Sequence, residues 1–348
     1  MEFRKLGRTD VSVSAICLGT MTYGQQTDEA DAFSQMDYAL EKGVNFFDTA
    51  EMYAIPPRAE TYGSTEKIIG AWMKARGSRD KIVLATKVAG RSGMNWLREN
   101  GAMARLGRKN IFYAVENSLK RLQTDFIDLY QLHWPDRPLE LFDSLSNAYR
   151  DCGAPDGVTF EETLGALGEL VQQGKIRAFG VSNETPWGVS KFLRGAEAGA
   201  GPRLVSIQNA YHLINRQFEL GLAEFSARED VGLLAYSPLA QGYLTGKYLH
   251  GAQPADARST VFKRGQRYQK PGVDDAIEDY INLAREFSLH PVHLALGFVT
   301  SRSFVTSNII GARNLDQLKI ILDAPFKLPA ELERRIDAIH QIRGNPAP

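Results

Sequence analysis

The sequence predicts an α/β fold in which eight parallel strands and their helices close into a (β/α)8 TIM barrel. Eight short apolar runs alternate with longer segments of helical periodicity, which is typical of parallel strands joined by helices. The runs are largely apolar rather than alternating, as expected for strands covered on both faces. No linker or repeat interrupts the series, so we expect residues 1–348 to form a single barrel domain. The absence of a linker favours the barrel over the alternative, an open doubly wound sheet.

The apolar runs define the predicted strands, which are residues 15–19, 44–48, 82–87, 126–133, 176–181, 204–208, 232–236 and 304–310. Polar residues Thr306, Ser307 and Asn308 interrupt the last run. Residues 19–24 follow the first run and lack the second glycine of the Gly-x-Gly-x-x-Gly turn, which marks dinucleotide sites in doubly wound sheets. This departure also favours the barrel.

Segments with apolar residues at helical spacing predict helices over residues 28–41, 65–75, 108–122, 159–172, 186–198, 218–228 and 316–322. Before the first strand, residues 3–13 contain the turn signal Gly7-Arg8-Thr9-Asp10, which predicts a β-hairpin at the barrel floor. After the last strand, residues 329–342 predict an extra C-terminal helix. Three long irregular segments, residues 89–107, 135–157 and 239–272, each follow a strand and are expected on the C-terminal rim, where such segments are usually functional or disordered.

The composition excludes several classes of partner. Lysine plus arginine and aspartate plus glutamate both total 41, so no strong net field would attract nucleic acid or an anionic membrane. Only two cysteines are present, Cys17 and Cys152, which predicts neither a disulfide framework nor a metal site. No signal peptide precedes the first strand, and no apolar run approaches the ~20 residues of a membrane helix. We therefore expect a cytoplasmic protein.

Ionisable residues end three successive predicted strands. Asp48 ends the second strand, Lys87 the third and His133 the fourth. Polar residues are common wherever strands meet water, but the carboxyl ends of barrel strands converge on one active-site cavity, which favours a shared function for the three. A lysine ammonium lowers the pKa of a nearby tyrosine, and a histidine can bind a carbonyl oxygen. Such a site transfers protons but lacks a hydride source, so it implies a cofactor.

The sequence resembles the aldo-keto reductase family, especially its bacterial Tas-like branch, which is related to the potassium-channel β subunits. Ordered motifs carry this resemblance over nearly the whole chain: GVNFFDTAEMY at 43–53, ATK at 85–87, LHWP at 132–135, GVSN at 180–183 and YSPLAQGYLTGK at 236–247. The resemblance implies a catalytic tetrad of Asp48, Tyr53, Lys87 and His133. Tyr53 would donate the proton, Lys87 would lower the pKa of Tyr53, Asp48 would orient Lys87, and His133 would position the carbonyl.

The resemblance alone singles out Tyr53, because the residues by themselves make it one of thirteen tyrosines and an ordinary rim aromatic. The resemblance also implies NADP(H). Ser182, Asn183 and Gln208 would bind the carboxamide, Tyr236 would stack under the nicotinamide, and Lys247, Arg258 and Arg313 would meet phosphates. The other implied cofactor contacts are Gly19, Thr20, Met21, Asp48, Ser237, Pro238, Leu239, Ala240, Gly242, Leu244, Gly311 and Gln317.

Three further arginines, Arg264, Arg267 and Arg302, are expected to be solvated surface charges. The family often has Glu-Asn shortly after the position of Gln317, where those residues hold the adenine. Here Ile320 and Ile321 stand in their place, so the adenine contacts are expected to differ.

The predicted function is NADPH-dependent reduction of aldehydes or ketones to alcohols, with a small-molecule carbonyl compound as the partner. One alternative is a cofactor-bound redox-sensing or regulatory subunit with slow turnover. A second alternative is a lyase or isomerase that uses Lys87 as a Schiff-base amine. Tyr23, Met94, Trp96 and Trp134 are candidate apolar walls of the substrate pocket, with packing beneath the loops as the alternative.

Overall fold

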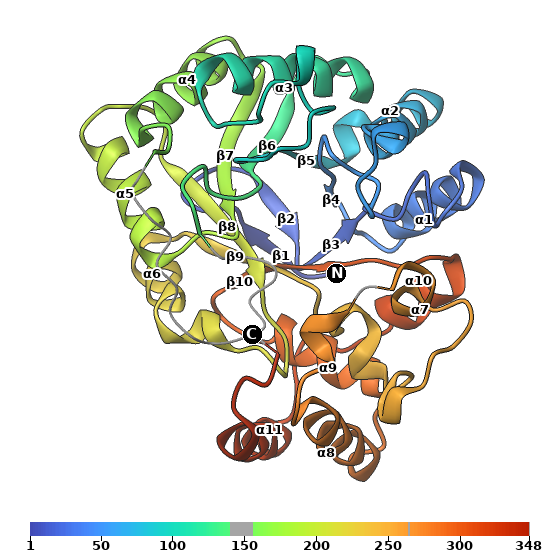
Figure 1. Ribbon diagram of the computed structural model, residues 1–348. Coiled ribbons are helices and arrows are strands. Elements are labelled where there is room, and N and C mark those ends of the chain that lie inside the picture. The colour runs from blue at the N-terminus through green and yellow to red at the C-terminus, as the bar shows by residue number, and fades with distance from the viewer. Residues whose placement is uncertain (140–155, 264, 348) are drawn as a thin grey trace.

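The computed structural model describes residues 1–139, 156–263 and 265–347, and it confirms the predicted barrel (Figure 1). All neighbouring strands of the barrel pair in parallel. In closed order the strands are β3 (Ile16–Gly19), β4 (Phe46–Asp48), β5 (Val83–Val88), β6 (Ile127–Leu132), β7 (Ile176–Ser182), β8 (Leu204–Ala210), β9 (Gly232–Tyr236) and β10 (Val305–Ile310). Each lies within or close to a predicted run.

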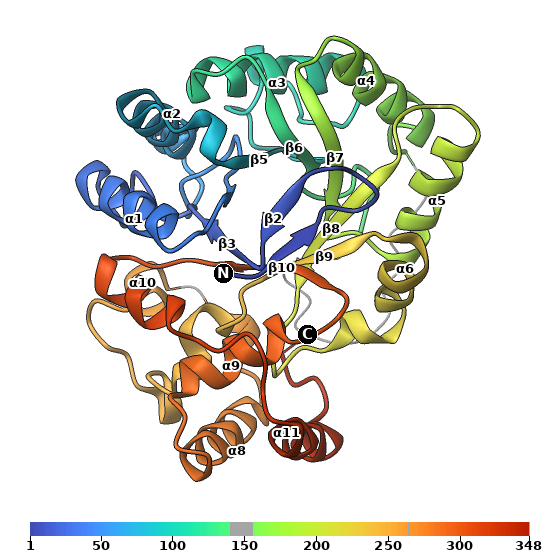
Figure 2. The ribbon, with the colours of Figure 1, turned by 180° about the vertical axis from the view of Figure 1, so that it is seen from behind.

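The N-terminal hairpin crosses one end of the barrel, as predicted (Figure 2). Its strands β1 (Phe3–Lys5) and β2 (Ser12–Ser14) pair antiparallel, with Arg4 opposite Val13. Arg4 donates hydrogen bonds to the carbonyl oxygens of Val305 and Thr300, next to the start of β10. The hairpin therefore closes the end at which the strands begin and leaves the opposite end for a site.

Helices surround the strands (Figure 1). They are α1 (Glu29–Glu41), α2 (Ser64–Arg76), α3 (Arg108–Leu122), α4 (Phe160–Gln172), α5 (Pro186–Glu197), α6 (Leu222–Glu229), α7 (Arg258–Phe262), α8 (Val273–Glu286), α9 (Pro291–Thr300), α10 (Leu315–Leu322) and α11 (Ala330–Arg343). Several begin at side-chain caps; Thr159 and Thr185, for example, accept hydrogen bonds from the first turns of α4 and α5. In the described residues, no helix is both long and apolar enough to span a bilayer.

The helices α7, α8 and α9, between β9 and β10, are not among those that the sequence predicts. Helix α9 is buried almost all round, so its sequence is a continuous apolar run without the stripe that marks a surface helix. Helix α8 does carry such a stripe, and its buried residues Val273, Ile277, Tyr280 and Ala284 recur at helical spacing. The signal for α8 was therefore present in the sequence.

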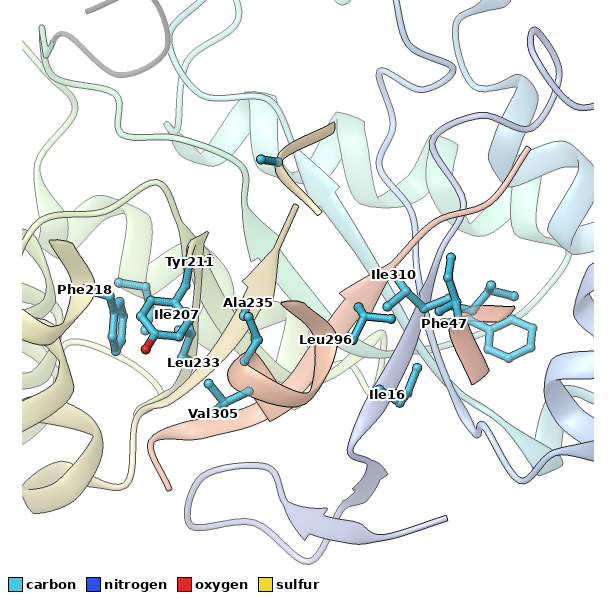
Figure 3. Close-up of a cluster of buried hydrophobic side chains, with 14 of the residues drawn as sticks. Ile16, Phe47, Ile207, Tyr211, Phe218, Leu233, Ala235, Leu296, Val305 and Ile310 are labelled. Atoms are coloured by element: carbon cyan, nitrogen blue, oxygen red, sulfur yellow. The ribbon is translucent and has the colours of Figure 1, made fainter. Parts of the chain in front are cut away.

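Strand residues divide between two apolar clusters. The outer cluster lies between strands and helices and includes Ile16, Phe47, Leu233 and Ile310 (Figure 3). The inner cluster fills the barrel near its floor, with Cys17, Phe46, Ala85, Leu129, Ala178 and Leu234. Because side chains on one face of a strand recur every second residue, the inward position that follows Phe46 is Asp48. By the same rule Lys87 follows Ala85, and Gln131 follows Leu129.

Candidate active site at the barrel mouth

A buried ion pair lies at the centre of the mouth. Lys87 Nζ is 2.5 Å from Asp48 Oδ1, and the two side chains are 0% and 4% exposed. Lys87 Nζ also donates to the carbonyl oxygen of Thr49 at 2.8 Å. Asp48 Oδ2 accepts from the amide nitrogens of Gln131 and Gln208, both at 2.9 Å. The carboxylate is thus fully engaged, as a buried charge requires.

The Tyr53 side chain reaches this pair from the loop after β4. Its hydroxyl lies 3.5 Å from Lys87 Nζ, and its ring meets the His133 ring edge-on with centroids 5.6 Å apart. Burial raises the pKa of Tyr53 and outweighs the lowering by the Lys87 charge, which Asp48 also opposes. Lys87 thus lowers the pKa of Tyr53, as the resemblance implies, but burial keeps the net shift upward. At neutral pH the hydroxyl keeps its proton.

Lys87 remains charged in this environment. Burial alone would lower the pKa of Lys87, but Asp48 and Tyr53 together raise it above its ordinary value. A protonated amine cannot attack a carbonyl carbon, so this arrangement argues against the Schiff-base alternative.

His133 is the fourth member of the cluster and follows β6, with its backbone N–H bonded to the carbonyl oxygen of Val88. Burial and the positive charge of Lys87 hold the pKa of His133 well below its ordinary value, so the imidazole is neutral. Its Nδ1 is buried and has no hydrogen-bond partner among the described residues. The structure therefore brings together all four residues of the predicted tetrad.

The residues predicted to bind the carboxamide form a hydrogen-bond chain beside the tetrad. The Tyr236 hydroxyl donates to Asn183 Oδ1 at 2.6 Å, and Asn183 Nδ2 donates to the His133 carbonyl oxygen at 2.9 Å. Ser182 Oγ donates to the carbonyl oxygen of Gln208. The side-chain nitrogen of Gln208, Nε2, is already bonded to Asp48 and Gln131, which leaves the side-chain oxygen Oε1 as its group for a ligand.

The predicted contacts before α1 lie beside Asp48. Thr20 donates its backbone N–H and its hydroxyl to the carbonyl oxygen of Asp48. A Cβ on Gly19 would stand 2.8 Å from the Ile309 side chain, so the packing against β10 requires a glycine there. Met21 Sδ lies 3.9 Å from the guanidinium of Arg258, which brings the α7 loop over this segment.

The turn after β9 has an unusual backbone. Ala240, Gln241 and Gly242 have left-handed φ values of 48°, 56° and 97°, and Ser237 is also left-handed. Such conformations are costly for residues other than glycine and cluster at ligand sites. This segment contains the predicted contacts Ser237, Pro238, Leu239, Ala240, Gly242 and Leu244.

Cations and unpaired hydroxyls lie on the loops that follow this turn. A Cβ on Gly242 would stand 3.1 Å from Lys247 Nζ, and Arg313 forms an ion pair with the exposed Asp256 at 2.8 Å. The hydroxyls of Ser259 and Thr260, next to Arg258, are buried without a hydrogen-bond partner in the part of the chain described. Cations beside unsatisfied donors suit an anionic, phosphate-bearing ligand. The set thus fits a phosphorylated dinucleotide.

At the predicted adenine end, Gln317 Oε1 accepts from the backbone N–H of Arg313, and Asn314 caps α10. Gly311 directly follows β10. Ile321 is buried in the outer cluster, whereas Ile320 is 45% exposed. Only Ile320 of the two is available to a ligand.

The structure corrects the expectation that Arg267 and Arg302 are solvated. Arg267 is partly buried and interacts with Tyr236 and Tyr268. Arg302 forms an ion pair with Glu333 at 3.0 Å and is largely buried. Arg302 also donates to the carbonyl oxygen of Phe298, so both side chains fold back onto the protein. The remaining one, Arg264, and Cys152 lie outside the described residues.

An apolar cluster covers Tyr53. It contains Leu97 and Trp134, with Met94 and Trp96 packed against it, so three of the four predicted pocket walls lie here. Trp134 Nε1 donates to the carbonyl oxygen of Arg91.

Tyr23 is the fourth predicted wall, and that prediction is wrong. Its side chain is fully buried in the outer cluster, and its hydroxyl donates to Gln35 of α1. The alternative expectation of packing beneath the loops applies to Tyr23.

Sequence reasoning missed three residues at this site, Gln131, Glu51 and Arg98. Gln131 bonds directly to Asp48, and the inward alternation from Leu129 along β6 was a signal for it. Glu51 and Arg98 form a second buried ion pair beside Tyr53. The only sign of Glu51 was a second charged residue after Asp48 in segment 44–53, and nothing in the sequence pointed to Arg98.

Comparison with known proteins agrees with the resemblance seen in the sequence. The model of the aldo/keto reductase family matches residues 15–341. The chain is 47% identical over 351 residues to Protein tas of Escherichia coli, and the match covers all of both chains. It is 34% identical to the uncharacterized oxidoreductase YrpG of Bacillus subtilis, over all of this chain and 98% of the relative. It is 29% identical to a probable voltage-gated potassium channel subunit beta of Arabidopsis thaliana, over 98% and 96% of the two chains.

Proposed function

The chain belongs to the aldo/keto reductase family of oxidoreductases, and we propose that it reduces an aldehyde or ketone to the alcohol with NADPH. The observation that carries this proposal is the contact of a protonated Tyr53 with the Lys87–Asp48 pair and the His133 ring. This arrangement has a proton donor, a cation beside the donor and a neutral histidine, all within one buried cluster. These groups serve proton transfer to a developing alkoxide.

The four side chains would share the work as follows. Tyr53 gives its proton to the carbonyl oxygen, and the charge left on the phenolate is stabilised by Lys87 Nζ at 3.5 Å. Asp48 balances the ammonium and holds it in place, so no unpaired charge is buried before the proton moves. Burial keeps the His133 imidazole neutral. Its one N–H group can donate a hydrogen bond to the same carbonyl oxygen.

Bound in this site, NADPH would be the source of the hydride for the carbonyl carbon. Asn183, Ser182 and the side-chain oxygen of Gln208 would bind the carboxamide of NADPH, beside the ring of Tyr236. Phosphates would be held by Lys247 and Arg258 together with the buried hydroxyls of Ser259 and Thr260, for which the described part of the chain offers no partner. Arg313 would bind the 2′-phosphate in place of Asp256, which favours NADPH over NADH.

The proposal is tested with Tyr53→Phe, which removes one oxygen atom from the site. We expect carbonyl reduction to fall by about 10²- to 10⁴-fold, because the general acid is lost, while NADPH binding stays within about twofold of wild type. NADPH oxidation with a panel of aldehydes measures the first quantity, and quenching of intrinsic fluorescence by NADPH measures the second.

Tyr38→Phe on the outer helix α1 is the matched control and should leave both quantities unchanged. Full activity in Tyr53→Phe would refute the assigned role. The likeness to a potassium channel subunit favours a cofactor-bound regulatory subunit as the second candidate function. Tight NADPH binding without turnover on any member of the panel would support that candidate instead.

A further inference from the structure

The second buried ion pair at the mouth, between Glu51 and Arg98, has no part in the proposed chemistry. Glu51 lies two residues before Tyr53, and Arg98 lies on the segment between β5 and α3. Both Glu51 oxygens face the guanidinium of Arg98: Oε1 is 2.9 Å from Nη2, and Oε2 is 2.9 Å from Nη1. The side chains are 0% and 4% exposed, as buried as Asp48 and Lys87. Such a pair is costly to bury and calls for an explanation other than stability.

Glu51 connects the two loops that carry the acid and its activating cation. Its Oε1 accepts the backbone N–H of Ala89 at 2.7 Å, and its own N–H donates to the carbonyl oxygen of Lys87 at 3.1 Å. The backbone around Lys87 is therefore joined at two points to a residue adjoining the Tyr53 turn. The distance between the Tyr53 hydroxyl and Lys87 Nζ depends on how these loops are set relative to each other.

Arg98 connects Glu51 to the segment that carries Leu97, a member of the apolar cluster over Tyr53. Arg98 Nη1 donates to the Leu97 carbonyl oxygen at 2.7 Å, and Arg98 Nε donates to Oδ1 of Asn110 in α3 at 2.8 Å. Leu97 is fully buried and packs in one cluster with Tyr53 and Trp134. Through Arg98, the segment that supplies Leu97 is held to a helix on one side and to Glu51 on the other.

We propose that Glu51 and Arg98 are positioning residues, whose bidentate pair sets Tyr53 relative to Lys87 and fixes the apolar wall over Tyr53. The proposal rests on the proposed reductase function of the site. The planar fork of Arg98 meets both carboxylate oxygens, and a lysine in its place would keep the charge but meet the carboxylate at one point. The geometry of the pair, beyond its charge, is what the reaction needs.

The molecule contains a matched control pair, Glu66 of α2 and Arg121 of α3. Their closest atoms are 2.6 Å apart, and the side chains are 0% and 11% exposed. Glu66 also accepts from the hydroxyl of Thr86, which neighbours Lys87 on β5. The two pairs thus share composition and burial, but the Glu66–Arg121 pair joins two helices to the outer face of the barrel. Arg121 lies over the ring of Tyr62 at the edge of the apolar cluster, but it donates its hydrogen bonds to Glu66 and Ser118 rather than to the segments around Tyr53 and Lys87.

The test compares Arg98→Met and Arg98→Lys with Arg121→Met and Arg121→Lys in the full chain. The midpoint temperature of thermal unfolding should drop by a similar amount in both Met variants. Only the Arg98 variants should lose kcat, by about 10- to 100-fold, because a misplacement near 1 Å costs that much in rate. The Kd of NADPH should stay within about twofold in all four. Arg98→Lys should fail to restore kcat, and equal kcat losses at the two pairs would overturn the proposal.

A second readout separates this proposal from the proposed function and serves if Arg98→Met does not fold. The ionisation of Tyr53 is read from tyrosinate absorbance, as the difference between each protein and the same protein with Tyr53→Phe. Glu51→Gln and Arg98→Lys should shift this ionisation, and Arg121→Lys should not. Wild type that binds NADPH without turnover refutes the reductase proposal alone. An unchanged Tyr53 ionisation refutes the positioning proposal alone.

Discussion

The two sides of the barrel mouth differ in how completely their polar groups are paired. Around the tetrad, Asp48 accepts three donors, and Lys87 is held by Asp48, Thr49 and Tyr53. On the side of the β9 and β10 loops, the buried hydroxyls of Ser259 and Thr260 have no partner within residues 1–139, 156–263 and 265–347, and Arg313 is held by an aspartate that is 80% exposed. The tetrad side is assembled before any ligand arrives, whereas the loop side is suited to be completed by one.

The physical reason for this difference is burial. A charge removed from water costs several kcal/mol unless it is paired, so the charges around Tyr53 must satisfy one another within the protein. Charges on the exposed loops remain hydrated, and their ion pairs exchange partners at little cost. Preorganisation is therefore expected at the site of proton transfer, and exchangeable contacts are expected at the phosphate cradle.

The largest expected effect is that of Lys87→Met, on the tetrad side. This change leaves Asp48 buried without a countercharge, so the free energy of unfolding should fall by about 3–5 kcal/mol. Carbonyl reduction should fall by at least about 10³-fold, because the phenolate of Tyr53 loses its stabilising cation. Denaturant unfolding and NADPH oxidation measure the two effects.

The double variant Asp48→Asn with Lys87→Met supplies the control. It removes both charges, so it should recover most of the lost stability and none of the activity. Recovery of activity in the double variant would contradict the role given to the cation.

The next effect concerns His212, which lies in the loop after β8 with both ring nitrogens buried and unpartnered among the described residues. Burial lowers the pKa of His212 to about 3 from 6.5. Because the folded-state pKa lies below the unfolded one, the unfolded chain takes up the proton first as the pH falls. Stability is therefore complete above pH 6.5 and is lost progressively between pH 6.5 and about 3.

Replacing the residue, as His212→Leu, should reduce the slope of unfolding free energy against pH in this window by up to about 1.4 kcal/mol per pH unit. Denaturant unfolding at several pH values measures the slope, with His250→Leu as the matched change of an exposed histidine. His133 contributes in the same direction on the tetrad side, so part of the slope should persist. An unchanged slope in His212→Leu would show that His212 is not held neutral.

On the loop side, Arg313→Leu should weaken NADPH binding by about 10- to 100-fold and leave NADH binding unchanged, because only NADPH carries the 2′-phosphate. Fluorescence titration with both cofactors measures this. In contrast to Lys87→Met, the free energy of unfolding should stay nearly constant, because the ion pair of Arg313 with Asp256 is exposed and contributes little to stability. Equal losses for both cofactors would remove Arg313 from the 2′-phosphate site.

The smallest effect is expected for Asp256→Asn, which releases Arg313 from its ion pair in the absence of ligand. NADPH should then bind about two- to fivefold more tightly, because Arg313 no longer has to leave the carboxylate. Titration at low and high salt provides the check, and the gain should shrink as salt screens the pair. Weaker binding in this variant would mean that Asp256 itself contributes to the cofactor site.

Much of the tetrad side follows from the order of residues along the strands. Apolar runs predict the eight strands, and the polar residue that ends a run predicts Asp48, Lys87 and His133 at the rim. Tyr53 required the family resemblance, because a tyrosine in a loop after a strand carries no periodic signal. Residues 273–300 show the limit of pattern reading, since α9 is apolar on all sides and lacks the stripe of a surface helix.

The sequence by itself determined the barrel, the residues that end its strands and the family, because these depend on local periodicity and on motifs of consecutive residues. Only the tertiary structure decided the partners. Asp48 meets Lys87, Gln131 and Gln208 across 39, 83 and 160 positions of chain. Closure of the barrel creates those contacts, and burial then decides the outcome: it keeps Tyr53 protonated and His133 neutral.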